Sequence, residues 1–468
     1  MNKFALLSFV CTVAGCSFIP GYERPAAPVP AQWPQKVGAG GTATAAGADA
    51  ARSVSVAEWQ AFFSDATLRQ LITLALEHNR DLRIAVARVE EARALAGLAR
   101  ADRLPTVDVN LQQQAAKLPA DLSSSGREAI SRRYDANLGV AAFELDFWGR
   151  VGSLETAARA TFFASEFAQR AFRSSLIAEV ASAWYSYTEL DARLALAEAA
   201  VATRAESRAL IGKRRDVGLA GDLDFLAADG AWQSARADAA NLARQRAAAE
   251  NALRLLVGSD GAVSLPANQA PAIATLPEIA VGLPSDVLLN RPDVLAAEQR
   301  LVAANANIGA ARAAFLPKIV LTATAGTASR ALSGLFGGGS GAWSFVPLLK
   351  WPLFDAGRSE ANVDLAEARM NVAVAEYEKT LQQAFREVAD LLAAREHYAV
   401  QLEALQAAEL AQAERLQRVE ARHLAGVSSY LELLDARRDH YAAQQSVLAV
   451  RRAQATTAAG LFKALGGG

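Results

Sequence analysis

The run from residue 357 to residue 462 contains no proline and has a single interruption, at residues 425–428. On both sides the sequence is rich in alanine and charged residues, with leucines at helical spacing. Gly426 is typical of a helix C-terminus, and the serines that follow are typical of an N-cap. The sequence therefore predicts a helical hairpin with a very tight tip. Its first arm, 357–423, would be roughly 100 Å long at 1.5 Å per residue, which is too long for a compact globular domain.

The second half of the chain repeats the pattern of the first. The segment 81–105 aligns with the segment 293–317 at a constant shift of 212 positions. Farther along, a shift of 208 positions aligns Gly218 with Gly426. The sequence thus predicts a tandem duplication, in which each copy contains a helix, a β-hairpin, a long helix, a tip and a shorter helix.

The predicted boundaries follow from glycine, proline and the changes of period. The first copy, 58–258, contains a helical pattern that starts near residue 58 and resumes over 81–103, a hairpin at 104–147, a long helix at 151–215 and a helix at 222–257. The second copy, 291–468, contains a helix at 293–315, a hairpin at 316–355, a long helix at 357–423 and a helix at 428–463. Residues 259–290, with four prolines, are predicted to be an irregular connector.

Each predicted hairpin consists of strands with one apolar and one polar face. In the first strand Val107, Val109 and Leu111 alternate with polar residues, which is the period-2 pattern of a strand. About 10 to 12 alternating residues match a tilted strand that crosses a bilayer, and the polar faces carry few charges, as a wet lumen needs. The alternative is a soluble four-stranded sheet packed on helices, although the neighbouring helices offer mostly alanine to cover it.

Four strands cannot close a barrel, because about eight are the practical minimum. In lipid, an open sheet edge leaves backbone groups without hydrogen bonds. If the strands cross a membrane, several chains must therefore contribute to one barrel. The helix lengths agree with such an assembly, because 81–103 and 222–257 stacked end to end match 151–215, and the second copy repeats this arrangement. Replicated around an axis, these columns would form a hollow helical cylinder with alanine-rich seams.

The N-terminus has the features of a bacterial lipoprotein signal. Lys3 supplies a positive charge, and residues 4–14 form an apolar stretch that is too short to span a bilayer. The stretch ends in Val13-Ala14-Gly15-Cys16, which is similar to a lipobox. We therefore expect residues 1–15 to be a signal peptide and Cys16 to carry a lipid anchor. The alternative is an ordinary secretory signal with a chance cysteine.

The residues that follow add two expectations. By the usual sorting pattern, Ser17 rather than aspartate after the cysteine indicates the outer membrane of a Gram-negative bacterium. Residues 16–57 are rich in proline, glycine and alanine and are predicted to be an extended strap. Apart from the lipid on Cys16, no cofactor is expected.

Composition and motifs exclude several functions. With a formal net charge of −1, the chain shows no basic surface for nucleic acid. Its four histidines are far apart in the sequence, so no metal site is predicted. The glycine-rich stretch 337–342 approaches a dinucleotide-binding pattern, but it lies between two predicted strands with no following helix. No nucleophile motif is present, and the chain is not expected to be an enzyme.

Four segments carry a resemblance to a known family. They are residues 21–25, 144–150, 282–293 and 352–358. The third, which runs from Gly282 to Asp293, is the most diagnostic. On these segments the chain resembles the TolC-like outer-membrane efflux proteins, also called outer membrane factors, in the lipoprotein branch that includes OprM and NodT. The resemblance covers essentially the whole mature chain.

The resemblance implies a mainly α fold with a membrane β-barrel. Three copies would form a homotrimer with a 12-stranded barrel in the outer membrane, a long periplasmic α-helical barrel and an equatorial belt. The loops 116–131 and 328–341 would lie outside the cell. Such a protein is the passive exit duct of a tripartite pump for small molecules. Its partners are a periplasmic adaptor, an inner-membrane efflux transporter, often of the resistance-nodulation-division type, and outer-membrane lipid.

Two alternative functions remain open at this point. The first is a lipid-anchored periplasmic coiled-coil scaffold without a pore, which would have no use for four strands of bilayer length. The second is the exit duct of a type I protein-secretion system, which the lipobox and the segment 282–293 disfavour. The exported substrates are set mainly by the inner-membrane transporter, so the sequence does not name them.

Two tips and one face of the last helix are the candidate sites. The tips consist of Val217, Gly218 and Leu219 and of Ala425, Gly426 and Val427. Each is at least a plain helix–helix turn, and the resemblance adds adaptor docking. On a helical wheel, one stripe is predicted to be the packing seam of the last helix. This stripe consists of Tyr430, Leu434, Tyr441 and Leu448.

Leu431, Asp435, Arg438 and Ala442 form a face about 100° away from that stripe. The resemblance implies that Leu431 and Asp435 line a periplasmic gate, so three copies would form an apolar ring and an acidic ring, which set selectivity in pores. From the residues alone, the alternative is that Asp435 merely pairs with Arg438. With Arg438 and His423, Leu431 and Asp435 make up the four candidate residues of the gate. His423 stands where the family usually has a tyrosine thought to hold the closed state.

Overall fold

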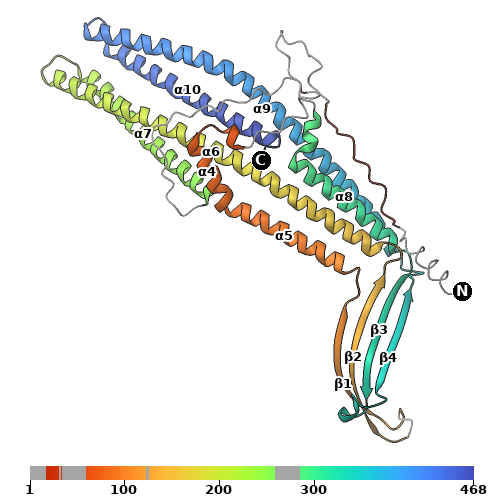
Figure 1. The fold of residues 1–468 in the computed structure, drawn as a ribbon. Coiled ribbons are helices and arrows are strands. Elements are labelled where there is room, and N and C mark those ends of the chain that lie inside the picture. The colour runs from red at the N-terminus through yellow and green to blue at the C-terminus, as the bar shows by residue number, and fades with distance from the viewer. Residues whose placement is uncertain (1–16, 31–32, 34–58, 123–125, 259–284, 468) are drawn as a thin grey trace. The chain divides into compact units, whose positions relative to one another are not determined.

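The computed structural model describes residues 17–30, 33, 59–122, 126–258 and 285–467. Within them the chain is mostly helical and has one four-stranded sheet (Figure 1). The predicted signal peptide, Cys16, most of the strap 16–57 and most of the connector 259–290 lie outside the described residues. Among the described residues, no helix combines the length and the apolar character that a bilayer crossing requires.

The chain divides into two compact units. Unit 1 consists of Met1–Ala26, Arg88–Glu166 and Ala296–Glu378, and unit 2 of Ala27–Ala87, Phe167–Leu295 and Lys379–Gly468. These units do not coincide with the two copies of the repeat, because each unit takes segments from both copies. The copies are therefore sequence repeats rather than separately folded domains.

The sheet belongs to unit 1 and combines both hairpins. Its strands are β1 (Val107–Leu118), β2 (Ala129–Leu145), β3 (Lys318–Ser329) and β4 (Gly341–Lys350), antiparallel in that order. The register places Val109 opposite Leu138, Leu138 opposite Ala325, and Ala325 opposite Trp343. Because directly opposed residues share a face, these side chains form one apolar face, and Val109, Leu138 and Trp343 are exposed on it.

Two strand predictions need correction. β2 has 17 residues rather than 10 to 12, because its ladder shifts register between Val140 and Phe143. Such a β-bulge moves the apolar side chains from even-numbered to odd-numbered positions. The regular alternation in the sequence therefore ends near Val140, although the strand continues to Leu145. β4 ends at Lys350 rather than at residues 353–355. Pro352, which has no amide to donate, follows two residues later.

Two helices of 67 residues each, α6 (Arg150–Asp216) and α9 (Arg358–Leu424), follow the hairpins. The amides of Val151 and Gly152 donate to the Asp146 carboxylate at 3.0 and 2.7 Å, and the amide of Ser359 donates to the Asp355 carboxylate at 2.9 Å. An aspartate therefore caps the first turn of each long helix, in the segments 144–150 and 352–358 that carry the family resemblance.

The other helices lie close to their predicted positions. They are α3 (Trp59–Phe62), α4 (Ala66–His78), α5 (Arg80–Ala101), α7 (Asp222–Val257), α8 (Pro292–Ala313) and α10 (Tyr430–Ala464), with short 3-10 helices at η2 (Ser285–Asn290) and η3 (Leu332–Gly334). The pattern that starts near residue 58 is divided into α3 and α4, because Asp65 accepts hydrogen bonds from the first amides of α4 and starts a new helix.

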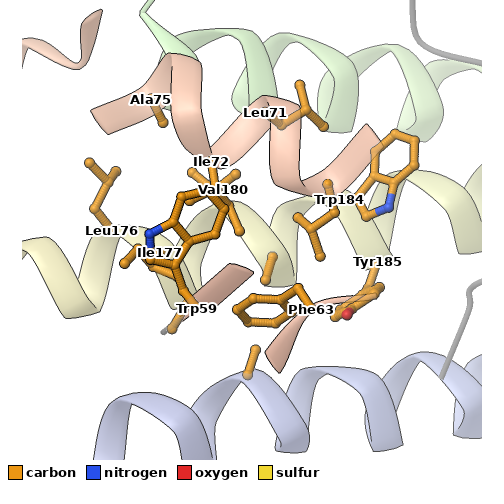
Figure 2. Close-up of a cluster of buried hydrophobic side chains, with 14 of the residues drawn as sticks. Trp59, Phe63, Leu71, Ile72, Ala75, Leu176, Ile177, Val180, Trp184 and Tyr185 are labelled. Atoms are coloured by element: carbon orange, nitrogen blue, oxygen red, sulfur yellow. The ribbon is translucent and has the colours of Figure 1, made fainter. Parts of the chain in front are cut away.

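The main core lies in unit 2, where α3 and α4 pack on α6 (Figure 2). Its large buried side chains include Trp59, Phe63, Leu71, Ile72, Leu176, Ile177, Val180, Trp184 and Tyr185. The indole of Trp184 donates to the Asp65 carboxylate at 2.8 Å. The same aspartate thus caps α4 and binds α6, which fixes the short helix on the long one.

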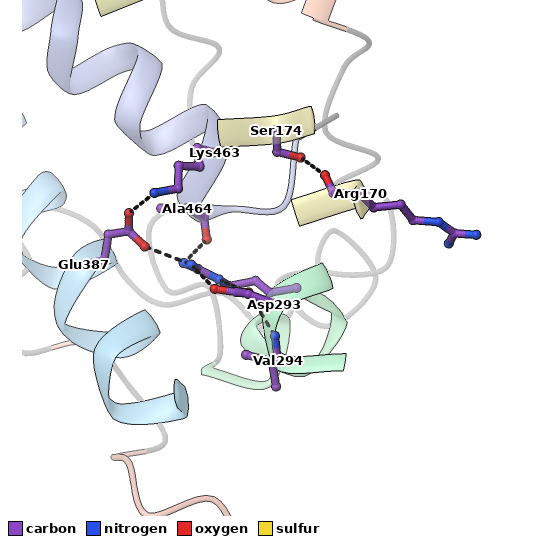
Figure 3. Close-up of polar contacts among 8 residues, drawn as sticks. Arg170, Ser174, Asp293, Val294, Glu387, Lys463 and Ala464 are labelled. Atoms are coloured by element: carbon purple, nitrogen blue, oxygen red, sulfur yellow. Dashed lines mark hydrogen bonds and ion pairs between the residues drawn. The ribbon is translucent and has the colours of Figure 1, made fainter. Parts of the chain in front are cut away.

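Arg291, at the end of the diagnostic segment 282–293, is 4 % exposed. Its guanidinium donates to the carbonyl oxygen of Ala464 at 2.8 Å and to the carboxylates of Asp293 and Glu387, each at 2.8 Å. Lys463 also contacts Glu387, at 3.1 Å (Figure 3). Burial opposes the charge of Asp293 and Glu387, but hydrogen bonds and ion pairs with Arg291 outweigh it and lower the pKa of both carboxyl groups.

Candidate docking tips and gate

The first hairpin tip joins α6 to α7. The amide of Leu219 donates to the carbonyl of Arg214 at 2.7 Å, and the amide of Gly218 donates to the carbonyl of Arg215 at 2.9 Å. This pair of bonds is the Schellman motif of helix C-termini, which requires a left-handed residue at the position of Gly218. Gly218 has φ 78°, a conformation that a glycine adopts without steric cost.

The second tip, between α9 and α10, has the same structure. The amide of Val427 donates to Arg422 at 2.9 Å, and the amide of Gly426 donates to His423 at 3.0 Å. Gly426 has φ 73°. Ser429 then caps α10 by accepting from the amide of Glu432. The two predicted tips are therefore one backbone motif used twice, at positions shifted by 208 residues.

Both tips present apolar side chains to solvent in the single chain. Leu219 is 79 % exposed and Val427 is 68 % exposed. In a Schellman motif, the apolar residue after the glycine often packs on a side chain of the last helical turn. The residues at that position in the two helices are Arg214 and Arg422, which offer no apolar partner of this kind. The other exposed apolar residues at or near the tips are Val217, Leu223, Leu226, Leu424 and Leu431.

His423 binds its own tip. Its Nδ1 lies 3.0 Å from the carbonyl oxygen of Ser428, and its ring centroid is 6.0 Å from that of Tyr430. Because a carbonyl only accepts, Nδ1 carries the proton in this contact. His423, the residue at the predicted latch position, thus bridges the turn between α9 and α10 through its contact with Ser428.

Three of the predicted gate residues, Leu431, Asp435 and Arg438, lie on the first turns of α10. Leu431 is exposed, and Nη1 of Arg438 is 3.3 Å from the carboxylate of Asp435. The i,i+3 pair that the residues alone favour is therefore present. Both side chains are more than a third exposed, and an exposed pair of this kind is worth only about 0.2–1 kcal/mol. Arg438 also contacts Asp439, at 3.3 Å.

Leu431, Asp435 and Arg438 line a cavity of about 510 Å³ between α10 and the pair α6 and α7. The other lining residues are Ala197, Ala200, Arg204, Ala231, Ser234, Ala235, Asp238, Leu434 and Tyr441. Three of the four predicted gate residues are therefore brought together. The fourth, His423, is on the far side of the tip, on α9.

The predicted packing seam accounts for only part of the packing of α10. Tyr430, Leu434, Tyr441 and Leu448 are half-buried, whereas the most buried apolar side chains in the same region are Leu433, Ala436, Val447 and Val450. Leu433 and Ala436 pack against Val419 of α9. α10 therefore packs against α9 on one side and against α6 and α7 on the other. A helical-wheel prediction with a single packing face identifies only one of these two sides.

Three polar contacts that connect α10 with α6 and α7 were not anticipated. The hydroxyl of Tyr441 donates to the Asp238 carboxylate, and Arg437 donates to Ser207 at 2.8 Å. A third contact joins Arg193 to Gln445. Burial and the bond to Asp238 raise the pKa of Tyr441 to about 12, so its hydroxyl remains a donor. The partners are 203 to 252 positions apart, and no local pattern links them.

No cluster of histidine, cysteine, aspartate and glutamate suited to a metal ion is found in the described part of the chain. The site consists instead of two exposed apolar tips, an exposed ion pair and a small cavity between helical hairpins.

Comparisons with known proteins show what the chain is similar to. The family model described as outer membrane efflux protein matches residues 71–259 and 283–467. The toluene efflux pump outer membrane protein TtgI of Pseudomonas putida is 43% identical over 475 residues, which cover 100% of this chain and 98% of TtgI. Outer membrane protein OprJ of Pseudomonas aeruginosa is 43% identical over 463 residues, covering 99% and 95%.

Solved structures show the same fold. A membrane protein from Pseudomonas aeruginosa has a TM-score of 0.88 and 42% identity, with 96% of this chain and 100% of that chain covered. The open state of the MtrE outer membrane channel of Neisseria gonorrhoeae has a TM-score of 0.84 and 37% identity, with 97% and 98% covered.

Proposed function

Because this chain belongs to the outer membrane efflux protein family, we propose that it is the outer-membrane exit duct of a tripartite efflux pump. The observation that carries this function is the match over essentially the whole chain to proteins named as outer membrane parts of efflux pumps. The duct conducts passively and does no covalent chemistry. Energy comes from an inner-membrane transporter, to which a periplasmic adaptor connects the duct.

Three copies of the chain form the duct. The outer strands β1 and β4 each pair on one side only among the described residues, and an open edge in lipid is costly. Pairing β1 of one copy with β4 of the next removes every edge and gives a 12-stranded barrel. The exposed apolar face that includes Val109, Leu138 and Trp343 then faces lipid. A pore-free scaffold gives no role to this face.

The long helices build the periplasmic part of the duct. α6 and α9 would be roughly 100 Å long at 67 residues each. The hairpins α6–α7 and α9–α10, three of each, form the helical barrel. The turns between β1 and β2 and between β3 and β4 lie at the opposite ends of the strands from these helices and therefore face the outside of the cell.

The adaptor docks on the two tips. Apolar side chains such as Leu219 and Val427 stand exposed on a rigid Schellman backbone, which suits a contact with a partner better than a solvated turn. Just beyond the second tip, Leu431 and Asp435 form the gate, where three copies place three carboxylates around one axis. The lipid on Cys16 anchors the mature chain to the outer membrane.

Complementation tests this function. The chain is expressed in a strain that lacks its own outer-membrane duct but keeps a matching adaptor and transporter. Since relatives are named for toluene and antibiotic efflux, we expect restored growth in toluene and in antibiotics. A chain that reaches the outer membrane but restores neither contradicts the proposal. Export of a protein substrate instead would favour a type I secretion duct.

A further inference from the structure

The two faces of the four-stranded sheet carry different charges. Residues that oppose one another across the strands share a face, so the register assigns each paired residue to one face or the other. One face carries charges of both signs, on Asp108, Arg133, Asp135, Glu144, Lys318 and Lys350. The other is the exposed apolar face that includes Val109, Leu138 and Trp343. Within the four strands that the structure describes, its only charged residues are Lys117 and Arg132, and both are positive.

Both basic residues lie beyond the apolar part of this face, toward the turns. Ile319 and Ser329 lie on the face near the two ends of β3, ten positions apart. Ten residues of strand rise about 33 Å, and the tilt of about 40° that barrel strands adopt reduces this to about 25 Å, the height of the apolar band of an outer-membrane barrel. Tyr134 lies opposite Ser329, at the edge of such a band, where aromatic girdles occur. Arg132 and then Lys117 follow in the next two rows toward the turn.

The two basic side chains are neighbours. Arg132 lies opposite Ala115, and Lys117 follows Ala115 by two positions. Arg132 and Lys117 are therefore diagonal neighbours on one face, about 7–8 Å apart. Arg132 forms no hydrogen bond or ion pair with any residue that the structure describes. Two like charges this close repel each other, and an anion bound between them removes that repulsion.

Glu128 is the one carboxylate that contacts this pair in the described part of the chain. Its Oε2 lies 2.9 Å from Nζ of Lys117, and the side chains of Lys117 and Glu128 are 67 % and 65 % exposed. An ion pair exposed to this degree adds little stability. Because a lysine ammonium has three donors, Lys117 can bind a second anion and keep Glu128. The guanidinium of Arg132 remains available in full.

A phosphate group on a membrane lipid fits this pair. In the proposed barrel both side chains lie on the lipid-facing surface and just outside its apolar band, which is where lipid head groups lie. Arginine binds phosphate through two parallel hydrogen bonds, and lysine adds a point charge. The outer leaflet of a Gram-negative outer membrane contains lipid A, a glycolipid that carries phosphate groups on its sugars. Its acyl chains would lie along the apolar rows of Leu111 and Val109.

We infer that Lys117 and Arg132 bind a phosphate group of lipid A in the outer leaflet of the outer membrane. The inference rests on the proposed function, because this face meets lipid only if the strands form a membrane-spanning barrel. A trimer then carries three such sites at the outer rim of the barrel. Each site is on the opposite face of the sheet from the lumen, so it binds lipid of the membrane rather than an exported substrate.

The test measures the binding of lipid A to the full chain in detergent, by native mass spectrometry. Arg132→Ala and Lys117→Ala should each weaken binding about fivefold, and the double variant about 25-fold, because each cation near an anionic lipid surface contributes a factor of this size. Lipid A without its phosphates should bind the parent at least about tenfold more weakly than intact lipid A. This second comparison uses the parent chain alone, so it does not depend on the folding of a variant.

Arg133→Ala is the matched control, because it removes the adjacent arginine on the other face of the sheet, together with its pair to Asp135 at 2.9 Å. It should bind lipid A like the parent, and an equal loss in this variant would overturn the inference. So would an unchanged affinity in the double variant, no effect of removing the lipid phosphates, or binding of inorganic phosphate as tight as that of lipid A.

Efflux by the parent in the complementation strain reports on the proposed function separately. A parent that restores efflux but does not prefer phosphorylated lipid A contradicts this inference alone. A parent that binds phosphorylated lipid A and reaches the outer membrane but restores no efflux contradicts the exit-duct function alone.

Discussion

Asn79 and Arg291 occupy equivalent positions in the two copies of the repeat and make equivalent hydrogen bonds. Nδ2 of Asn79 donates to the carbonyl oxygen of Leu256 at 2.8 Å, and Nη1 of Arg291 donates to that of Ala464 at 2.8 Å. In each copy the donor lies just before a short helix, and the acceptor lies at the C-terminal end of the last helix. The contact has been kept in both copies, with an amide in one and a guanidinium in the other.

Replacing these two residues should therefore have unequal effects. Arg291→Ala leaves the carboxylates of Asp293 and Glu387 without their buried partner, and we expect a loss of about 3 kcal/mol in the free energy of unfolding. Asn79→Ala removes neutral hydrogen bonds and should cost about 1–2 kcal/mol. Chemical unfolding in detergent, followed by circular dichroism, measures both. Arg312→Ala, at an exposed pair, is the control and should cost less than about 1 kcal/mol; equal losses at all three positions would refute the argument.

The same network predicts a dependence of stability on pH. The pKa values of Asp293 and Glu387 are lowered in the folded chain, so their contribution is present above the unfolded value of about 4 and is lost as pH falls through the folded values. We expect the melting temperature of the parent to drop between about pH 5 and pH 3. Arg291→Ala should show a smaller drop, and an identical profile for both proteins would show that the network is not responsible.

Local signals predicted the helices well but not their contacts. Gly221 and Gly258 flank α7, which has the predicted bounds, because glycine and helix period act within a few residues. The β-bulge after Val140 was missed, since it interrupts the alternation that reveals a strand. The bond from Tyr441 to Asp238 joins two helices that only the tertiary fold brings together. The lipid anchor stays a prediction.

The tip glycines should be needed for efflux rather than for folding. A Cβ at Gly218 or Gly426 would meet no atom within 4 Å, so the cost of valine there arises from the positive φ and is roughly 1–2 kcal/mol, confined to the turn. If the chain is the trimeric duct proposed above, Gly426→Val should remove drug resistance while the amount of trimer in the outer membrane stays at the parent level. Gly230→Ala, in open space on α7, is the control and should be neutral or slightly stabilising. Loss of the trimer in Gly426→Val would mean that the tip is purely structural.

Asp435 and Arg438 allow the gate to be separated from the ion pair. Either alanine variant breaks the 3.3 Å pair, and Arg438→Ala also removes the contact with Asp439. A purely structural role therefore predicts a small loss of stability for each, about 0.2–1 kcal/mol per exposed pair, and no difference in conductance. If three copies of Asp435 form an acidic ring, Asp435→Ala should lower the cation selectivity of single channels in planar bilayers, whereas Arg438→Ala, which leaves the carboxylates unopposed, should raise it. Leu431→Ala should raise conductance by widening the apolar ring. Conductance and selectivity like those of the parent in all three variants would rule out this gate.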